Sequence, residues 1–196
     1  MPVIELLRSC RSTFLRSVLV KLARDTGSLD ILIKDLRNWC EGPEIKDEES
    51  LEFLLRKFVD FPEFRSLFYY RVGKNSIPLQ ILKVLYPPQL ALFIGTPDIG
   101  PGFYLEHSFS TIISARSIGK NCQINQQVTI GHTEKGSPTI GDNVRIFAGA
   151  IVFGDITIGD NAIIGAGTLV NKSVPANCTV AGNPARVTRF HDASPQ

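Results

Sequence analysis

The sequence predicts an α+β protein in which a helical domain over residues 1–90 precedes a solenoid of short parallel strands over residues 91–196, with a short polar tail. Two observations support this division. In the first half, apolar residues recur at helical spacing between Gly and Pro breaks. In the second half, aliphatic residues recur every six positions. That period fits neither a helix nor a simple strand, but it fits a coil whose flat sides are six residues long.

The first half is expected to form helices over residues 1–24, 29–40, 47–58 and 62–73, with a last short stretch before Pro87 and Pro88. Pro62 suits a first helical turn and Gly73 suits a helix end. One packed face of the first helix should comprise Ile4, Leu7, Phe14, Val18 and Leu22. Its Arg and Ser content leaves a transit peptide or a membrane-surface helix as the alternative, although no continuous apolar stretch or cleavage site is visible.

The six-residue pattern of the second half has a large and a small inward position on each side. The aliphatic anchors are Ile112, Ile118, Ile124, Ile130, Ile140, Ile146, Val152, Ile158, Ile164 and Val170. Four residues after most anchors comes a smaller or β-branched residue that should fill the space beside it: Cys122, Val128, Val144, Ala150, Ile156, Ala162, Thr168 and Val174. Gly or Asn often follows the anchor directly, and we expect it to accommodate the backbone angles of the coil corners.

The step from Ile130 to Ile140 contains four residues more than the period allows. Residues 132–138 should therefore leave the coil as a protruding loop. Loops of this kind tend to be functional, because the coil itself offers only flat walls.

Composition excludes several classes of function. The 21 Lys and Arg nearly balance the 19 Asp and Glu, so nothing favours a nucleic-acid partner. The four cysteines form no CxxC pair and indicate free thiols in a reducing, cytoplasmic location. No apolar run approaches the roughly 20 residues that cross a bilayer.

Four stretches of the second half together resemble bacterial serine O-acetyltransferases and related polysaccharide O-acetyltransferases of the hexapeptide-repeat superfamily. They are GFYLEHSFSTIIS, INQQVTIG, the long run from Pro138 to Val170, and VAGNPARV. The resemblance is close over residues 94–190 and loose over 60–90. It implies a left-handed parallel β-helix, acetyl-CoA as co-substrate, and homotrimers or a dimer of trimers with active sites between neighbouring solenoids.

Transfer of an acetyl group from a thioester to a hydroxyl needs a base that removes the hydroxyl proton during attack. Histidine suits this role near neutral pH. Of the three histidines, His107 lies in LEHS at the position of the family's catalytic histidine, whereas His191 lies beside the polar tail. The predicted catalytic residues are His107 and the adjacent Glu106, which replaces a family aspartate. The predicted acceptor-binding residues are Asp98 and, in the loop, His132.

The resemblance also places the acetyl-CoA arm against backbone near Ala148 and Ala166, with Gly149 and Gly167 permitting close approach. Lys172, Arg186 and Arg189 near the last coils form a cationic patch that either meets the CoA phosphates or is simply solvated. Glycine spacing matches no P-loop or dinucleotide motif.

Two departures from serine acetyltransferases affect the expected acceptor. Leu92 stands where the family has the aspartate that orients the histidine, so Asp98, Glu106 or a backbone carbonyl could orient His107 instead. Gly136 and Ser137 replace an Arg-His pair that grips the amino acid. A sugar or similar neutral hydroxyl is therefore the favoured acceptor, and free serine, as in cysteine biosynthesis, is the alternative.

Two rival functions come from other classes. A γ-carbonic-anhydrase-like metalloenzyme would need three converging histidines, which the spacing of His107, His132 and His191 does not provide, so no metal is expected. A non-catalytic scaffold subunit is the other rival, and retention of LEHS and AGNPAR argues against it.

Overall fold

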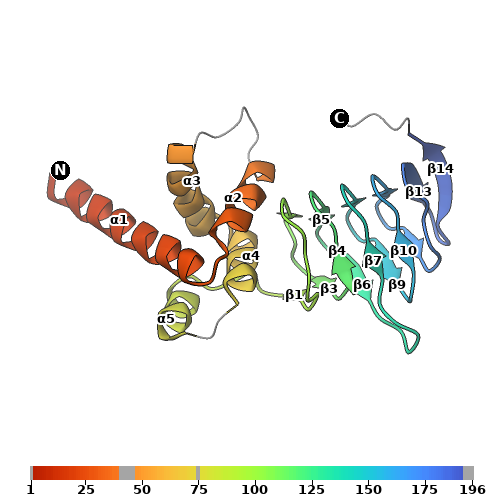
Figure 1. Ribbon diagram of the computed structural model, residues 1–196, viewed down its shortest axis with the longest axis horizontal. Coiled ribbons are helices and arrows are strands. Elements are labelled where there is room, and N and C mark those ends of the chain that lie inside the picture. Colours follow the sequence, from red (N-terminus) through yellow and green to blue (C-terminus); the bar gives the residue numbers. More distant parts are fainter. Residues whose placement is uncertain (1, 40–46, 74–75, 192–196) are drawn as a thin grey trace. The chain divides into compact units, whose positions relative to one another are not determined.

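The computed structural model describes residues 2–39, 47–73 and 76–191, with side chains for residues 13–39, 51–73 and 76–191 (Figure 1). The chain folds as two compact units, Met1–Pro88 and Gln89–Gln196. No helix within these described ranges is long and apolar enough to cross a membrane.

The first unit is helical, as predicted. Its elements are α1 (Pro2–Asp25), α2 (Leu29–Asn38), α3 (Asp47–Asp60), α4 (Pro62–Val72) and α5 (Ile77–Leu85). Pro62 occupies the first turn of α4, where its missing N–H has no helical partner to lose. Gly73 ends α4 with a positive φ of 61°.

The packed face of α1 differs from the predicted one. Leu22 is buried as predicted, but Phe14 is 72 % exposed and its neighbours Leu15 and Leu19 are buried instead. The helix is thus rotated by about one residue (roughly 100°) from the predicted face, because Leu15, Leu19 and Leu22 form a more continuous stripe. The side chains of Ile4 and Leu7 lie outside the described residues.

A buried ion pair joins α2 to α4. Arg71 donates from Nε to Asp35 Oδ2 over 2.9 Å and from Nη2 to Oδ1 over 3.1 Å. The Asp35 side chain is fully buried, and the Ser28 hydroxyl donates to the Arg71 carbonyl over 2.7 Å. A paired, bidentate contact is the arrangement that makes such burial tolerable.

The second unit is a left-handed parallel β-helix, which confirms the predicted solenoid. The chain runs through three sheets in turn (Figure 1). Sheet A contains β1 (Leu92–Ile94), β3 (Thr111–Ile113), β6 (Thr129–Gly131), β9 (Ile151–Phe153) and β12 (Leu169–Val170). Sheet B contains β4 (Ser117–Ile118), β7 (Thr139–Ile140) and β10 (Thr157–Ile158). Sheet C contains β2 (Tyr104–Glu106), β5 (Gln123–Asn125), β8 (Arg145–Ile146), β11 (Ile163–Ile164), β13 (Cys178–Ala181) and the antiparallel β14 (Arg186–Phe190).

The inward positions of the solenoid follow the six-residue pattern from Ile118 onward. Each predicted anchor from Ile118 to Val170 is at most 3 % exposed. On sheet C, Arg145 pairs with Ile163, 18 residues later, so that three six-residue sides complete one coil. Stacked coils thereby form one continuous aliphatic core.

Three of the glycines that follow anchors, Gly119, Gly141 and Gly159, serve close packing between coils instead of the predicted corner geometry. Gly119 and Gly141 lack a positive φ. A Cβ on Gly119 would lie 2.6 Å from the backbone of Gly141 in the next coil. The left-handed backbone falls two residues later, at Asn121, Asn143 and Asn161, with φ between 55° and 59°. The corner prediction was therefore misplaced by two residues.

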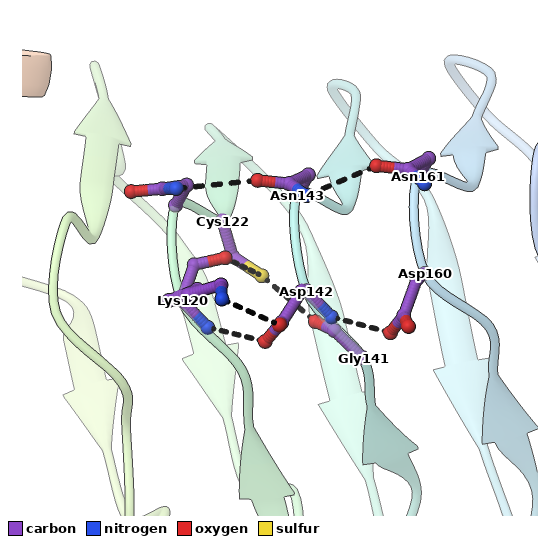
Figure 2. A network of polar contacts seen from close by, with 8 residues as sticks. Lys120, Cys122, Gly141, Asp142, Asn143, Asp160 and Asn161 are labelled. Carbon is purple, nitrogen blue, oxygen red and sulfur yellow. Dashed lines mark hydrogen bonds and ion pairs between the residues drawn. The ribbon is translucent and has the colours of Figure 1, made fainter. Parts of the chain in front are cut away.

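Side-chain ladders tie these corners together, as Figure 2 shows. The amide of Asn121 donates to Asn143 Oδ1 over 3.2 Å, and Asn143 donates to Asn161 over 3.0 Å. Beside this ladder, Asp142 accepts from the backbone N–H of Lys120 over 2.9 Å, and Asp160 accepts from the N–H of Asp142 over 2.8 Å. Each coil thus fixes the height and register of the next.

Replacing Gly119 by Ala should lower the free energy of unfolding by about 1–3 kcal/mol, because the added methyl group meets rigid backbone of the adjacent coil. Gly131→Ala is the matched control, since a Cβ there meets nothing within 4 Å. Urea unfolding of both variants measures the difference. Equal stability of the two variants would show that the coils do not depend on this close approach.

Cys122 should resist alkylation in the native protein. Its thiol is buried and contacts the Gly141 carbonyl at 3.1 Å, and burial raises the pKa of Cys122 to about 12. Little reactive thiolate therefore exists at pH about 8, whereas the unfolded chain has a thiol pKa of about 8.5. Iodoacetamide labelling with mass spectrometry, before and after denaturation, checks this. Rapid native labelling would contradict the buried position.

Candidate functional site

The segment that carries His107 departs from the six-residue period. The inward residues Leu105 and Ile113 are eight positions apart, whereas the equivalent residues of the next coil, Ile124 and Ile130, are six apart. As a result, Ile112 is 47 % exposed and Ile113 is fully buried. The prediction of Ile112 as an inward anchor is wrong because this corner contains two additional residues.

Backbone geometry presents the His107 side chain at this enlarged corner. Strand β2 ends at Glu106, and His107 and Ser110 adopt left-handed conformations with φ of 55° and 51°. Histidine is among the residues that visit this region more readily. The Phe109 N–H donates to the His107 carbonyl and closes a tight turn. The imidazole is consequently exposed on a constrained piece of backbone.

A hydrogen-bonded cluster lies beside the histidine on the outer face of sheet C. Gln123 Nε2 donates to Glu106 Oε2 over 2.7 Å and to Asn125 Oδ1 over 3.1 Å. Glu106 and Asn125 are register partners on adjacent strands β2 and β5. Sequence reasoning named Glu106 but missed Gln123 and Asn125. Their contacts depend on the 19-residue offset between β2 and β5, which the six-residue pattern does not reveal.

The small residues expected to bind acetyl-CoA share an edge with His107. We call the turns from sheet C to sheet A the histidine edge: residues 107–110, 126–128, 147–150 and 165–168. Gly149 donates its N–H to the Gln126 carbonyl over 3.1 Å, and Gly167 donates to the Ala148 carbonyl over 2.9 Å. Ala148, Gly149, Ala166 and Gly167 therefore line up along the coils that follow His107.

Beyond the histidine corner, the last turn of this edge has small residues that are exposed to solvent. Ala166 and Gly167 are exposed, and a Cβ added to Gly167 would meet nothing within 4 Å. A slender ligand could therefore approach the backbone here.

Three side-chain oxygens on the same edge are buried without a hydrogen-bond partner in the part of the chain that the structure describes. They are Ser108 Oγ, Gln126 Oε1 and Thr168 Oγ1. Such atoms are rare in folded proteins and deserve a structural reason. Among the described residues, the histidine edge therefore contains several buried polar atoms whose hydrogen-bonding capacity is unused.

The predicted loop is present as a short hairpin between β6 and β7 (Figure 1). Thr133 and Gly136 exchange backbone hydrogen bonds of 2.9 and 3.1 Å, which places Glu134 and Lys135 at the tip. The loop lengthens its coil, so Gln123 pairs with Arg145 22 residues later.

An ion pair supports the base of the loop. Arg116 Nη2 lies 2.8 Å from Asp155 Oδ1, and a Cβ on Gly136 would lie 3.1 Å from this arginine atom. The loop therefore rests against coils on both sides of it.

Other predicted site residues lie on a different edge. We call the turns from sheet A to sheet B the loop edge: residues 95–98, 114–116, 132–138, 154–156 and 171–173. Asp98, His132 and Lys172 lie there and are exposed. Arg186 begins β14 and pairs with Ala181 beyond the last turn of the histidine edge. One chain therefore does not bring Asp98 or His132 to His107.

His191 is engaged elsewhere, since its Nε2 lies 2.9 Å from Thr179 Oγ1. Within the described ranges, no three His, Cys, Asp or Glu side chains are grouped so as to hold a metal ion.

Comparisons with known proteins agree with this architecture. The family described as "Bacterial transferase hexapeptide (six repeats)" matches residues 137–172. A serine acetyltransferase of Synechococcus elongatus is 45 % identical over 94 residues, which cover 45 % of this chain and 38 % of that protein. The chain thus spans between a third and a half of the length of several curated relatives that it matches.

Solved structures extend the similarity to both units. Soybean serine acetyltransferase is 30 % identical with a TM-score of 0.62, covering 81 % of this chain and 68 % of that one. A serine acetyltransferase in complex with CoA is 25 % identical with a TM-score of 0.61, covering 89 % and 75 %. The chain therefore belongs to the hexapeptide-repeat acyltransferase superfamily and resembles its serine acetyltransferases.

Proposed function

We propose that the chain is an acetyl-CoA-dependent O-acetyltransferase that moves an acetyl group onto a small hydroxyl acceptor. The observation that carries this proposal is the histidine edge. It sets an exposed histidine on a constrained corner, next to a hydrogen-bonded carboxylate, at the head of a row of small residues. The proposed base, the polar contacts for the acceptor and the row of small residues expected to bind acetyl-CoA therefore lie together along one edge.

His107 acts as the general base. It accepts the acceptor's hydroxyl proton as that oxygen attacks the thioester carbonyl, and it returns the proton to the departing sulfur. The products are the acetyl ester and the free CoA thiol. Because the imidazole is exposed, it is accessible to a bound acceptor without rearrangement of the core.

The small residues of the histidine edge fit the co-substrate. Ala148, Gly149, Ala166 and Gly167 leave backbone accessible to a narrow pantetheine arm. Arg186 stands exposed beyond the last turn of this edge, where it can meet phosphate, whereas Lys172 would have to come from the loop edge of another copy. The serine acetyltransferase structure solved in complex with CoA supports acetyl-CoA as the co-substrate.

The polar groups beside His107 favour a neutral, sugar-like acceptor. Arg116 of a neighbouring copy, which could meet a substrate carboxylate, is already paired with Asp155 of its own chain. Glu106 with the amides Gln123 and Asn125 offers hydrogen bonds suited to hydroxyl groups. Serine is the second candidate, because the curated relatives are named serine acetyltransferases and Glu106 could meet an ammonium group.

We further propose a homotrimer, with a dimer of trimers as the larger alternative. His132 and Asp98 can contribute to the His107 site only if the loop edge of one copy meets the histidine edge of the next. Free thiols at Cys122 and Cys178 support a reducing cytoplasmic location as part of the proposal.

His107→Ala should lower turnover by about a hundredfold or more, because no other group takes the hydroxyl proton. CoA affinity should be unchanged. The assay follows thiol release from acetyl-CoA with a panel of sugars, other neutral alcohols and free serine, and calorimetry measures CoA binding. His191→Ala is the matched control, since His191 bonds Thr179 away from the site.

A near-normal rate for His107→Ala would remove this residue from the mechanism. Efficient acetylation of serine at millimolar concentration would select the second candidate acceptor. Failure of the native protein to release thiol with any acceptor would refute the proposed activity.

A further inference from the structure

Gln123 is an outward-facing residue of β5 that sequence reasoning overlooked. Its side-chain amide nitrogen donates to both Glu106 Oε2 and Asn125 Oδ1, at 2.7 and 3.1 Å. It therefore links the strand that carries the predicted catalytic segment to the next coil.

These two contacts fix the orientation of the Gln123 amide. An amide nitrogen has two hydrogens, and here one oxygen acceptor is available for each. If the amide were reversed, its oxygen would face the oxygens of Glu106 and Asn125. That arrangement is repulsive, so Asn125 acts as the group that keeps the donor pointed at Glu106.

Gln123 also does not neutralise the charge of Glu106, because its amide is uncharged. A neutral amide orients one carboxylate oxygen without supplying an opposing charge, and Oε1 stays available to a ligand. Since Glu106 directly precedes His107, a carboxylate held in this way can accept a hydrogen bond from the acceptor molecule whose hydroxyl His107 deprotonates.

We propose that Gln123 is a positioning residue for the acceptor, acting through Glu106 and locked by Asn125. This inference rests on the proposed acetyltransferase function and deepens it. The carboxylate-amide cluster recognises acceptors that donate hydrogen bonds, as polyhydroxylated molecules do. It binds the acceptor, and it does not take part in the proton transfer at His107.

Gln123→Ala should raise the KM for the acceptor at least tenfold, while kcat, the KM for acetyl-CoA and the melting temperature stay near native values. Hydrogen bonds to charged groups contribute about 1.5–3 kcal/mol, equivalent to roughly ten- to hundredfold in binding. Gln123→Met, which keeps the side-chain length, should behave like Gln123→Ala and guards against a folding defect. Ile163→Ala is the matched control, because Ile163 occupies the same register position two coils away.

Gln123→Glu provides a readout that a merely structural role would not give. It places a second carboxylate against Glu106, and like charges raise the pKa of one of the pair. Below that pKa, the protonated group donates to Glu106 and restores the contact; above it, the two groups repel. The ratio of variant to native kcat/KM should therefore rise as the pH falls from about 8.5 to about 5. For Gln123→Ala this ratio should not change with pH.

The titratable neighbours of Gln123 in the sheet register are Tyr104 and Arg145. Tyrosine and arginine have usual pKa values of about 10 and above 12, so neither should produce a change in this range. The other titratable neighbour is His107, which follows Glu106 directly. An added carboxylate would favour its protonated form and lower the ratio toward low pH, which is opposite to the predicted rise.

Native acceptor KM in both Gln123→Ala and Gln123→Met, in an active protein, would overturn this inference alone. A pH-independent ratio for Gln123→Glu would do the same. An inactive native protein would instead overturn the proposed function, and this inference with it.

Discussion

Close stacking of the coils is the constraint on which the second unit depends. Strands of two to five residues are too short to be stable alone, so each coil is held by its neighbours. Glycine at positions such as Gly119 lets backbones approach, and the ladders of Asn and Asp side chains fix the register (Figure 2). This packing sets where every outward side chain lies. The site is therefore a consequence of coil geometry, since residues far apart in sequence meet only because their coils stack in register.

The two insertions into the six-residue period are the two places where chemistry is proposed. Two additional residues at the His107 corner and four at the loop project from the wall of the coil. A regular coil can offer only flat sheets and tight corners. The enlarged corner, with left-handed backbone at His107 and Ser110, lets an imidazole stand clear of the wall beside Glu106.

The sequence predicted the features that repeat and was less reliable where the repeat breaks. The anchors from Ile118 onward and the loop at 132–138 were predicted, because burial of aliphatic side chains imposes the period. Ile112 was misassigned, since the additional residues at the corner carry no signal of their own. The contact between Gln123 and Glu106 was missed because outward residues follow no period. Their pairing depends on coil lengths that vary from 16 to 22 residues along sheet C. The buried face of α1 was partly mispredicted for a related reason. The prediction assumes that apolar residues are buried, whereas Phe14 is apolar but exposed.

Within one chain, His107 and the loop lie on different edges, so the central claim is that a complete site forms between copies. Co-expression of His107→Ala chains with chains whose loop is shortened by four residues tests this claim. Each variant alone should be nearly inactive. The whole co-expressed preparation should recover about a quarter of native turnover, because random assembly pairs an intact His107 with an intact neighbouring loop at about one site in four, and purified mixed trimers should recover about a third. No recovery in mixed trimers, shown to have formed by differential tags, would contradict the account.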